Sequence, residues 1–200
     1  MSEEAHPSSW IVEVRARLGS PAPRRLPPND ARQAAVLIPL YVDAGELWTL
    51  LTKRSEQLPH HRGQIAFPGG SLEAGEDFWQ AALRESEEEI GLDPKKVLQL
   101  GELDEAETPS GFRIMPCVGA VPHPIETQPD GEEVEEVFAV PLTTLANPRM
   151  VEDRVVTVDG QERELRVYHV GGRQVWGLTA RIVQGLLVRL GLEVPQGGDH

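Results

Sequence analysis

The sequence predicts an α/β protein in which helices pack against a mixed β-sheet. Short apolar runs separated by turn residues recur along the chain, and only a few segments have helical spacing. Strands interleaved with few helices are typical of an α/β sandwich. The chain has 200 residues, 40% of them hydrophobic, which is enough to build the core of one ordinary domain.

The N-terminal region is predicted to be a short helix followed by a stiff linker. Residues 9–19 follow a serine cap and place apolar side chains at roughly helical spacing, and Gly19 ends the segment. The stretch SPAPRRLPP comes next and is too rich in proline for regular structure. We therefore expect residues 1–30 to form an N-terminal helix and linker, and residues 31–195 to form the main domain.

The next segment predicts a β-hairpin, a loop and a helix. Two β-rich runs, AAVLIPLYV and LWTLLT, flank DAGE, whose aspartate and glycine suit a tight turn. The loop QLPHHRGQIAFPGG follows. Residues 76–90 then contain no glycine or proline, so we expect a helix that ends at Gly91.

The second half of the chain is predicted to be mostly sheet. Further apolar runs occur at KVLQLGEL, FRIMPCVGAV, EEVFAVPL, RVVTV and ELRVYHV, and VTVDGQEREL indicates a second hairpin. The segment LTARIVQGLLVRLGL has helical periodicity and predicts the last helix. The tail PQGGDH is expected to be frayed.

Charge and composition exclude several classes of protein. A formal net charge of −13 argues against a general nucleic-acid or membrane-surface binder, because those partners require a basic face. Cys117 is the single cysteine and is expected to be buried and inert. The sequence has no secretory start and no apolar stretch of about 20 residues, which favours a soluble cytoplasmic protein. Oligomeric state is left open, and a homodimer is compatible with the sequence.

The predicted helix at residues 76–90 carries three acidic side chains that could bind a metal ion. Glu85, Glu88 and Glu89 share one face beside an apolar stripe, and like charges at this spacing destabilise a helix by roughly 0.2–0.5 kcal/mol per pair. Carboxylates are the hard ligands that Mg²⁺ or Mn²⁺ prefers. A solvated acidic face is the alternative interpretation of such a run taken alone.

The segment from Gly70 to Leu92, GSLEAGEDFWQAALRESEEEIGL, resembles the Nudix box. That pattern is a glycine, five residues, Glu, seven residues, then Arg-Glu-aliphatic-x-Glu-Glu-x-Gly-aliphatic. The matching positions are Gly70, Glu76, Arg84, Glu85, Glu88, Glu89, Gly91 and Leu92. Ser86 departs, because it stands where the family usually has an aliphatic residue, and we expect it on the packed stripe.

The resemblance implies a Nudix fold, an α/β/α sandwich with a mixed sheet and a loop-helix-loop motif. It also implies that Glu85 and Glu89 are the main ligands of Mg²⁺ or Mn²⁺, with Glu88 as a further or water-mediated ligand. Gly70 would offer its backbone carbonyl, while Glu76 and Arg84 would hold the loop to the helix. Related enzymes bring an acid from a later loop toward the metals, so Glu133 and Glu136 are candidate general bases, although a solvated acidic turn is the simpler interpretation of each.

Within the superfamily, the segment LLTKRSEQLPHHRGQIAFPGG at residues 50–70 resembles the signature of the coenzyme A diphosphatase branch. Pro59 stands where that signature usually has arginine. Gly69 and Gly70 permit close approach of backbone to a phosphate. Arg54, Lys53 or Arg62 could neutralise the ribose 3′-phosphate of coenzyme A, and an ordinary surface cation is the alternative for each. His60 and His61 are interpreted as structural or substrate-contacting.

The branch resemblance extends over about residues 31–190 and includes Ser110-Gly111-Phe112, the run EEVEEVFAVPL and the segment Trp176–Ala180. It implies metal-dependent cleavage of coenzyme A into 4′-phosphopantetheine and adenosine 3′,5′-bisphosphate. Three alternatives stay open at this point. They are a Nudix hydrolase of ADP-ribose, a dinucleotide such as NADH or a nucleoside triphosphate; a non-catalytic nucleotide-binding Nudix module; and an acidic interaction protein without a site.

Overall fold

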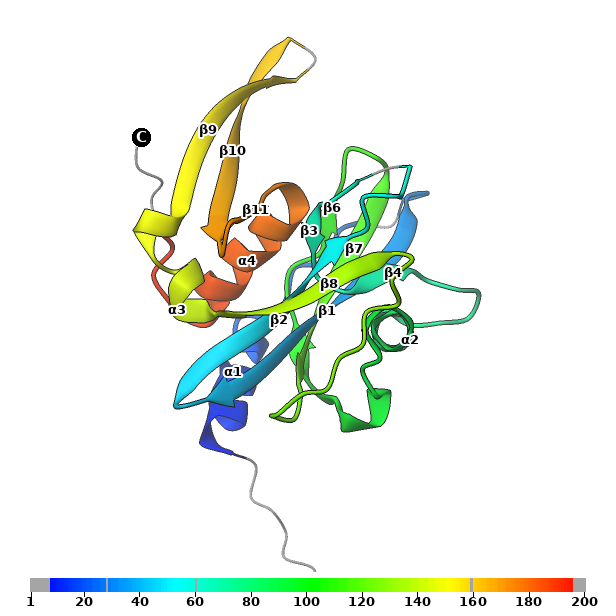
Figure 1. The fold of residues 1–200 in the computed structure, drawn as a ribbon, viewed down its shortest axis with the longest axis vertical. Coiled ribbons are helices and arrows are strands. Elements are labelled where there is room, and N and C mark those ends of the chain that lie inside the picture. The colour runs from blue at the N-terminus through cyan, green and yellow to red at the C-terminus, as the bar shows by residue number, and fades with distance from the viewer. Residues whose placement is uncertain (1–7, 28, 60, 159, 196–200) are drawn as a thin grey trace, which may run out of the picture.

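An eight-stranded mixed sheet forms the centre of the protein in this computed structural model, which describes residues 8–27, 29–59, 61–158 and 160–195 (Figure 1). Five strands follow the order β3-β2-β1-β7-β5, while β8 pairs with β2, β4 with β1 and β6 with β7. Only β1 and β7 pair in parallel within the described residues, so the predicted mixed sheet is confirmed. The strands are β1 (Arg32–Asp43), β2 (Glu46–Arg54), β3 (Ile65–Ala66), β4 (Gly69–Ser71), β5 (Leu98–Glu102), β6 (Ala106–Glu107), β7 (Phe112–Ala120) and β8 (Val134–Pro141).

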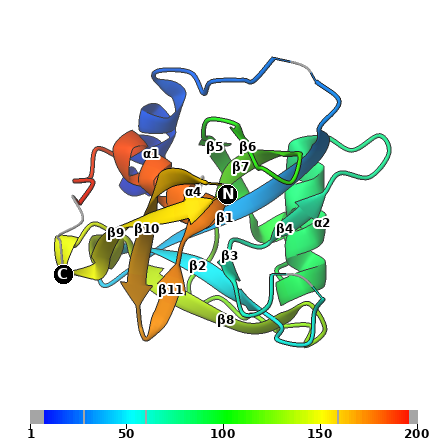
Figure 2. The ribbon, with the colours of Figure 1, turned by 90° about the horizontal axis from the view of Figure 1, so that it is seen from above.

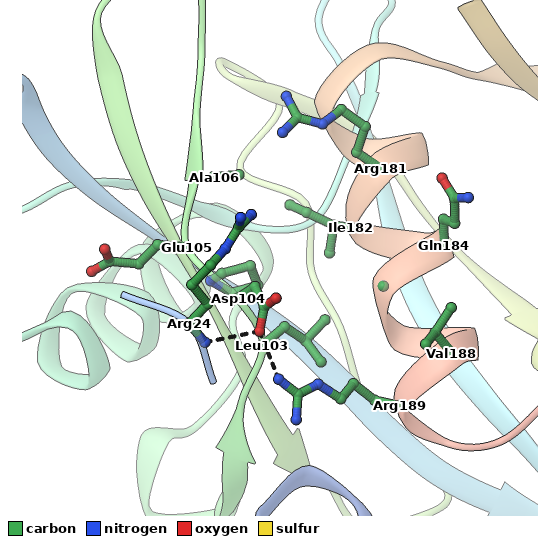
Figure 3. Close-up of a pocket in the computed structure, with 12 residues that line it drawn as sticks. Arg24, Leu103, Asp104, Glu105, Ala106, Arg181, Ile182, Gln184, Val188 and Arg189 are labelled. Carbon is green, nitrogen blue, oxygen red and sulfur yellow. Dashed lines mark hydrogen bonds and ion pairs between the residues drawn. The ribbon is translucent and has the colours of Figure 1, made fainter. Parts of the chain in front are cut away.

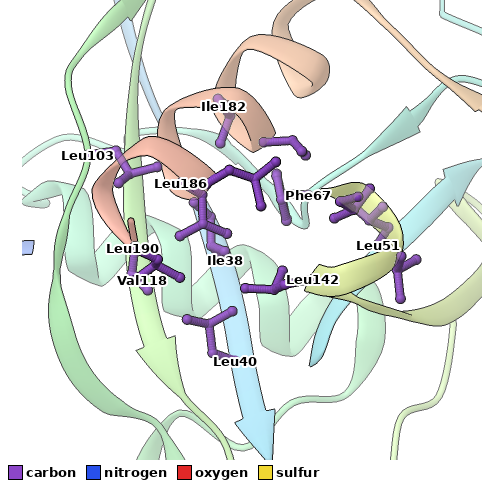
Figure 4. Packing of buried hydrophobic residues seen from close by; sticks show 14 of the residues in the cluster. Ile38, Leu40, Leu51, Phe67, Leu103, Val118, Leu142, Ile182, Leu186 and Leu190 are labelled. Atoms are coloured by element: carbon purple, nitrogen blue, oxygen red, sulfur yellow. The ribbon is translucent and has the colours of Figure 1, made fainter. Parts of the chain in front are cut away.

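Helices cover both faces of this sheet. Helix α2 (Phe78–Ile90) packs on one face, and α1 (Ser9–Gly19) and α4 (Gly177–Arg189) pack on the other (Figures 1 and 2). Successive side chains of a strand point to opposite faces, so Leu37 of β1 joins the core under α2 and Ile38 joins the core under α4 (Figure 4). The sheet is therefore buried on both sides, as in the predicted α/β/α sandwich.

The first hairpin, β1–β2, is confirmed. Its turn residues Ala44 and Gly45 both have positive φ angles, 49° and 81°, which suits the two-residue turns that match strand twist.

Cys117 of β7 is fully buried, and burial raises the pKa of its thiol, which confirms the expected inert environment. In the described residues, no helix is both long and apolar enough to cross a membrane.

The N-terminal helix α1 is also confirmed, but its predicted serine cap is not formed. Ser8 lies at the cap position and its side chain makes no capping hydrogen bond. Leu18 instead anchors α1 by packing into the core beneath α4. Residues 1–7 and Pro28 lie outside the described part of the chain, and the proposed domain boundary at residue 30 stays a prediction.

Helix α2 begins two residues later than predicted. Asp77 accepts a hydrogen bond from the backbone N–H of Gln80, and the Gln80 side chain accepts one from the Asp77 N–H, so this capping box fixes the first turn at Phe78. Gly91 ends the helix in the left-handed conformation with φ 69°, as expected.

A second, three-stranded sheet lies in the C-terminal third. Its strands are β9 (Val151–Val158), β10 (Gln161–Val170) and β11 (Arg173–Val175), and the predicted β9–β10 hairpin extends away from the main sheet (Figure 1). The short helix α3 (Leu142–Leu145) and the 3-10 turn η2 (Pro148–Met150) precede it. Another 3-10 turn, η1 (Pro94–Lys96), lies between α2 and β5. The predicted frayed tail lies outside the described residues from position 196 onward.

Candidate active site

A cavity of about 520 Å³ lies beside the sheet where the loop of residues 50–70, helix α2 and the start of α4 meet. Its walls combine segments that are far apart in sequence. The lining residues are Ala34, Arg54, His61, Gln64, Ala66, Gly69, Gly70, Ser71, Glu85, Thr108, Ser110, Phe112, Ile114, Glu133, Leu178 and Thr179. Five residues predicted for the site line this cavity, namely Arg54, Gly69, Gly70, Glu85 and Glu133.

Arg84 ties the glycine-rich loop to the helix. Its guanidinium donates to both carboxylate oxygens of Glu76, at 2.8 and 3.0 Å, and to the Ser71 carbonyl at 3.0 Å. Glu76 in turn accepts the backbone N–H of Glu73 at 2.8 Å, and the hydrogen bonds from Arg84 lower the pKa of Glu76. The expected role of Glu76 and Arg84 as a clasp between loop and helix is confirmed.

Glu89 is a buried carboxylate without a cation at contact distance. It is 5% exposed, accepts the backbone N–H of Gly69 at 2.9 Å, and forms no ion pair with a described residue. Burial raises its pKa to about 8, and the negative charges of Glu85 and Glu133 add to that effect. A bound cation would stabilise the ionised form of Glu89, which this environment otherwise disfavours.

Glu85 lies against the backbone of the loop. A Cβ built on Gly70 would stand 2.4 Å from the Glu85 carboxylate, so only glycine permits this approach. Burial raises the pKa of Glu85, although the hydrogen bond from Arg84 at 3.0 Å opposes the shift. Glu85, Glu89 and the Gly70 carbonyl are hard oxygen donors, and their chemistry fits Mg²⁺ or Mn²⁺.

Glu88 is placed differently from its two neighbours. Its side chain is 60% exposed and accepts a hydrogen bond from Arg84 at 3.1 Å, and it does not line the cavity. Across the described residues, no three His, Cys, Asp or Glu side chains are grouped as a ready metal cluster. The three glutamates therefore share a helix, but Glu88 is directed toward Arg84 and only Glu85 and Glu89 face the loop.

Arg54 and Glu133 form the cationic and acidic pair of the cavity. The Arg54 guanidinium lies 3.5 Å from the Glu133 carboxylate, and its buried Nε has no hydrogen-bond partner among the described residues. Asp130 shapes the turn beneath Glu133 by accepting the backbone N–H groups of residues 132–134. A long ion pair and an unsatisfied donor leave Arg54 able to bind an anion.

Two other predicted residues lie elsewhere. Glu136 pairs with Arg173, whose Nε donates to it at 3.1 Å, and it lines a separate hollow beside Lys53. Arg62 donates to the Leu58 carbonyl at 2.7 Å and does not line the cavity. The structure thus separates Glu136 and Arg62 from the residues they were grouped with, because β8 alternates its side chains and Arg62 folds back on its own loop.

The remaining loop residues divide in the same way. Lys53 pairs with Glu56 and Glu135, at 3.4 and 3.5 Å, and points away from the cavity. His61 lines the cavity with a positive φ of 57°, consistent with the expected substrate-contacting position. His60 lies outside the described residues.

Several cavity residues were not among the predicted site residues. They are Gln64, Thr108, Ser110, Phe112, Leu178 and Thr179. A signal for most of them was present, since Ser110-Gly111-Phe112 and the segment 176–180 match recurring pieces of the coenzyme A branch. Their convergence with the glycine-rich loop depends on the long-range packing of β7 and α4, which no local pattern specifies.

Similarity to known proteins identifies the family of this chain. The family description "NUDIX domain" matches residues 31–159. The chain belongs to the Nudix family. It is 34% identical over 165 residues to "Uncharacterized Nudix hydrolase NudL" of Enterobacter sp. (strain 638), covering 82% of this chain and 85% of that protein. The protein of the same name from Photorhabdus laumondii is 35% identical over 167 residues, covering 83% and 88%.

A solved structure supports the same fold. The MutT/nudix family protein from Enterococcus faecalis has a TM-score of 0.56 and 17% identity, covering 96% of this chain and 75% of that one. The predicted Nudix fold and the predicted enzyme class, a hydrolase acting on diphosphate bonds, are confirmed. Nudix hydrolases generally use divalent ions such as Mg²⁺ or Mn²⁺. Of the proposed metal ligands in the Nudix box, Gly70 and Glu85 line the cavity, and Glu89 is next to it through its hydrogen bond with Gly69.

Proposed function

We propose that this Nudix hydrolase cleaves the diphosphate of coenzyme A or its derivatives into 4′-phosphopantetheine and adenosine 3′,5′-bisphosphate. One observation carries the proposal. The segment of residues 50–70, which matches the coenzyme A signature, supplies Arg54, Gln64 and Gly70 to the wall of the cavity that Glu85 also lines. The part of the sequence that distinguishes this branch therefore contacts the space where a substrate would bind.

The signature residues hold that wall in shape. Thr52 donates to the Ala66 carbonyl at 3.1 Å, and the backbones of Arg54 and Gln64 pair at 3.0 Å. Thr179 of α4 donates to the Ile65 carbonyl at 3.0 Å, which joins the late segment to the same wall. These contacts fix Arg54 at the edge of the cavity, where a diphosphate would meet its guanidinium.

The acidic residues have two roles in this proposal. Glu85, Glu89 and the Gly70 carbonyl would hold Mg²⁺ or Mn²⁺, with Glu88 as a further or water-mediated ligand, and the ion would neutralise charge on the diphosphate. Glu133 is the candidate general base, because its carboxylate lines the cavity and its ion pair with Arg54 is long. Glu136 is the weaker candidate, since Arg173 holds it outside the cavity.

The test is product analysis of the purified protein with Mg²⁺ or Mn²⁺ and four separate substrates, coenzyme A, ADP-ribose, NADH and a nucleoside triphosphate. Release of phosphopantetheine from coenzyme A in preference to hydrolysis of the others is the expected result. Preference for another diphosphate would overturn the substrate while keeping the Nudix chemistry. Inactivity on all four would favour a binding module.

A pair of variants then tests the wall itself. Arg54→Ala should raise KM for the preferred substrate by about tenfold, the value of one charge-assisted hydrogen bond. Lys53→Ala is the matched control, because it removes the neighbouring cation whose side chain points away from the cavity. Equal effects of the two variants would contradict the assignment of Arg54.

A further inference from the structure

A second cavity, of about 330 Å³, lies next to the candidate active site and is lined by arginines (Figure 3). Its walls come from the proline-rich linker, the segment between β5 and β6, and helix α4. Arg24, Arg181 and Arg189 are its basic residues, and Asp104 and Glu105 are its acidic ones. None of these residues has a role in the proposed diphosphate cleavage.

The acidic residues of this cavity are already paired. Asp104 accepts from the Arg189 guanidinium at 2.6 Å and from the backbone N–H of Arg24 at 2.9 Å. Glu105 is 4% exposed and pairs with the buried Arg113 at 2.5 Å. The negative charge of the cavity is therefore balanced by Arg189 and Arg113.

Arg24 and Arg181 form no ion pair at contact distance with a described residue, although Arg24 also acts electrostatically on Asp104. The Arg181 guanidinium has one long hydrogen bond, to the Glu107 carbonyl at 3.5 Å, and the Arg24 guanidinium forms no hydrogen bond with a described residue. In Figure 3 their guanidinium groups approach from opposite walls, the linker and α4, and end on the Ala106 side of the cavity. Two unpaired cations facing one hollow repel each other, and a bound anion would relieve that repulsion.

The linker holds Arg24 firmly in this position. The Arg24 carbonyl accepts the Glu105 N–H at 3.0 Å, and two residues later the Leu26 N–H donates to the Glu105 carboxylate at 2.6 Å. Arg113 also donates to the carbonyls of Leu26 and Pro27, at 2.6 and 3.2 Å. These hydrogen bonds attach the linker to the domain and fix the position of the Arg24 backbone.

The two cavities are neighbours along the same elements. Ala106 of β6 lines the second cavity, and Thr108, the residue directly after β6, lines the first. On α4, Leu178 lines the first cavity and Arg181 the second, three residues or about 4.5 Å further along the helix axis. A ligand with a diphosphate in the first cavity could therefore place a second anionic group in the other.

We propose that Arg24 and Arg181 form an anion subsite for a phosphomonoester. Resting on the proposed coenzyme A activity, we assign this group as the ribose 3′-phosphate of the substrate. Charge-assisted contacts from two guanidinium groups suit a phosphate dianion. Three other cations were predicted for this phosphate. Arg62 donates to the Leu58 carbonyl and Lys53 pairs with glutamates. Arg54 lines the first cavity, where the diphosphate is proposed to bind.

Kinetics with coenzyme A and with 3′-dephospho-coenzyme A test the assignment to the substrate. Arg181→Met should raise KM for coenzyme A by about tenfold and Arg24→Met/Arg181→Met by about 100-fold, with KM for the dephosphorylated substrate unchanged. Arg163→Met, at an exposed position of β10, controls for the loss of one positive charge. Equal changes with both substrates, or no change with either, would overturn the assignment to the 3′-phosphate.

Calorimetric titration of the metal-free protein with inorganic phosphate tests the subsite independently of activity. The wild-type protein should bind phosphate at this subsite, and Arg24→Met/Arg181→Met should weaken that binding by at least about tenfold. Loss of phosphate binding with unchanged substrate kinetics would assign the subsite to a free phosphate and overturn the 3′-phosphate. Identical titrations of wild type and double variant would overturn the subsite. If coenzyme A is no substrate, the proposed function fails and this titration decides the subsite alone.

Discussion

Two regions of the molecule each bury a glutamate, but only one of them supplies a charged partner in contact with the carboxylate. Glu105, beneath the linker, is 4% exposed and accepts hydrogen bonds from Arg113 at 2.5 and 3.1 Å and from the Leu26 N–H. Glu89, on α2, is 5% exposed, and among the described residues only the Gly69 N–H lies at hydrogen-bond distance from its carboxylate. The first carboxylate is satisfied by the protein. The second carboxylate, that of Glu89, would be stabilised by a bound cation.

This contrast distinguishes structural from functional acids more clearly than burial does. A carboxylate with a full set of partners stabilises the fold only as part of its pair. A buried carboxylate with a raised pKa and no cation at contact distance is costly to the fold, which indicates a ligand site. The same contrast separates Glu133, at a long distance from Arg54, from Glu136, which Arg173 holds tightly.

The largest effect is expected for Glu89→Gln. The amide oxygen can still accept the Gly69 N–H, but a charged ligand is lost, so diphosphatase activity should fall by about 10³-fold, roughly 4 kcal/mol, while the protein stays folded. Steady-state kinetics with Mg²⁺ and circular dichroism measure both. Glu87→Gln, at an exposed position of the same helix, should keep near-normal activity. Full activity of Glu89→Gln would contradict the assignment of Glu89 as a functional acid that holds the metal ion.

Glu105→Gln should have the reverse signature. It leaves the buried Arg113 without its charged partner, so the free energy of unfolding should drop by about 3 kcal/mol, with the activity per folded molecule retained. Denaturant titration gives the stability. The control is Glu107→Gln, on the exposed end of β6, which should shift stability by less than about 0.5 kcal/mol. A drop in activity without a drop in stability would show that Glu105 is a functional acid and not a structural one.

The pH dependence of stability sharpens the comparison further. In the metal-free protein the pKa of Glu89 is raised to about 8, so this residue favours folding fully below its unfolded pKa near 4.5, and the benefit is lost as pH rises through 8. Wild type should therefore lose stability relative to Glu89→Gln across this window, by at most about 1.4 kcal/mol per pH unit. Parallel stability curves for the two proteins between pH 5 and 8 would contradict the raised pKa.

Glu133 and Glu136 provide a smaller test of the same idea. Glu133→Gln should lower kcat by at least about tenfold, because general-base catalysis typically contributes 10²–10⁴-fold. Glu136→Gln should change kcat by less than about twofold, since its carboxylate is paired with Arg173 outside the cavity. A larger loss of kcat for Glu136→Gln than for Glu133→Gln would contradict the assignment of Glu133 as the general base.

The smallest effect is expected at Ser86, which departs from the family pattern. Ser86 is fully buried on the packed face of α2, as expected, and its hydroxyl donates to the Ala82 carbonyl at 2.6 Å. That carbonyl keeps its helical partner, so Ser86→Ala should change stability by less than about 1 kcal/mol and leave metal-dependent activity intact. Thermal unfolding measures the first and kinetics the second. A large loss of activity would mean that this position affects the carboxylates.

The sequence by itself determined the local parts of this protein. The spacing of the Nudix box specified the loop, the helix and which glutamates lie on it, and DAGE specified the first hairpin, because turns, caps and helical faces depend on residues a few positions apart. The late start of α2 is a local miss, since Asp77 and Gln80 form a capping box that was not recognised.

Only the tertiary structure decided which charges are satisfied. The parallel pairing of β1 with β7 joins residues about eighty positions apart, and it brings Phe112 to the glycine-rich loop. The partners of Glu105 and Glu136 likewise depend on where the linker and β8 run in space. Sequence spacing orders side chains along one element, whereas burial and ion pairing arise between elements, so the division between structural and functional acids exists only in the folded chain.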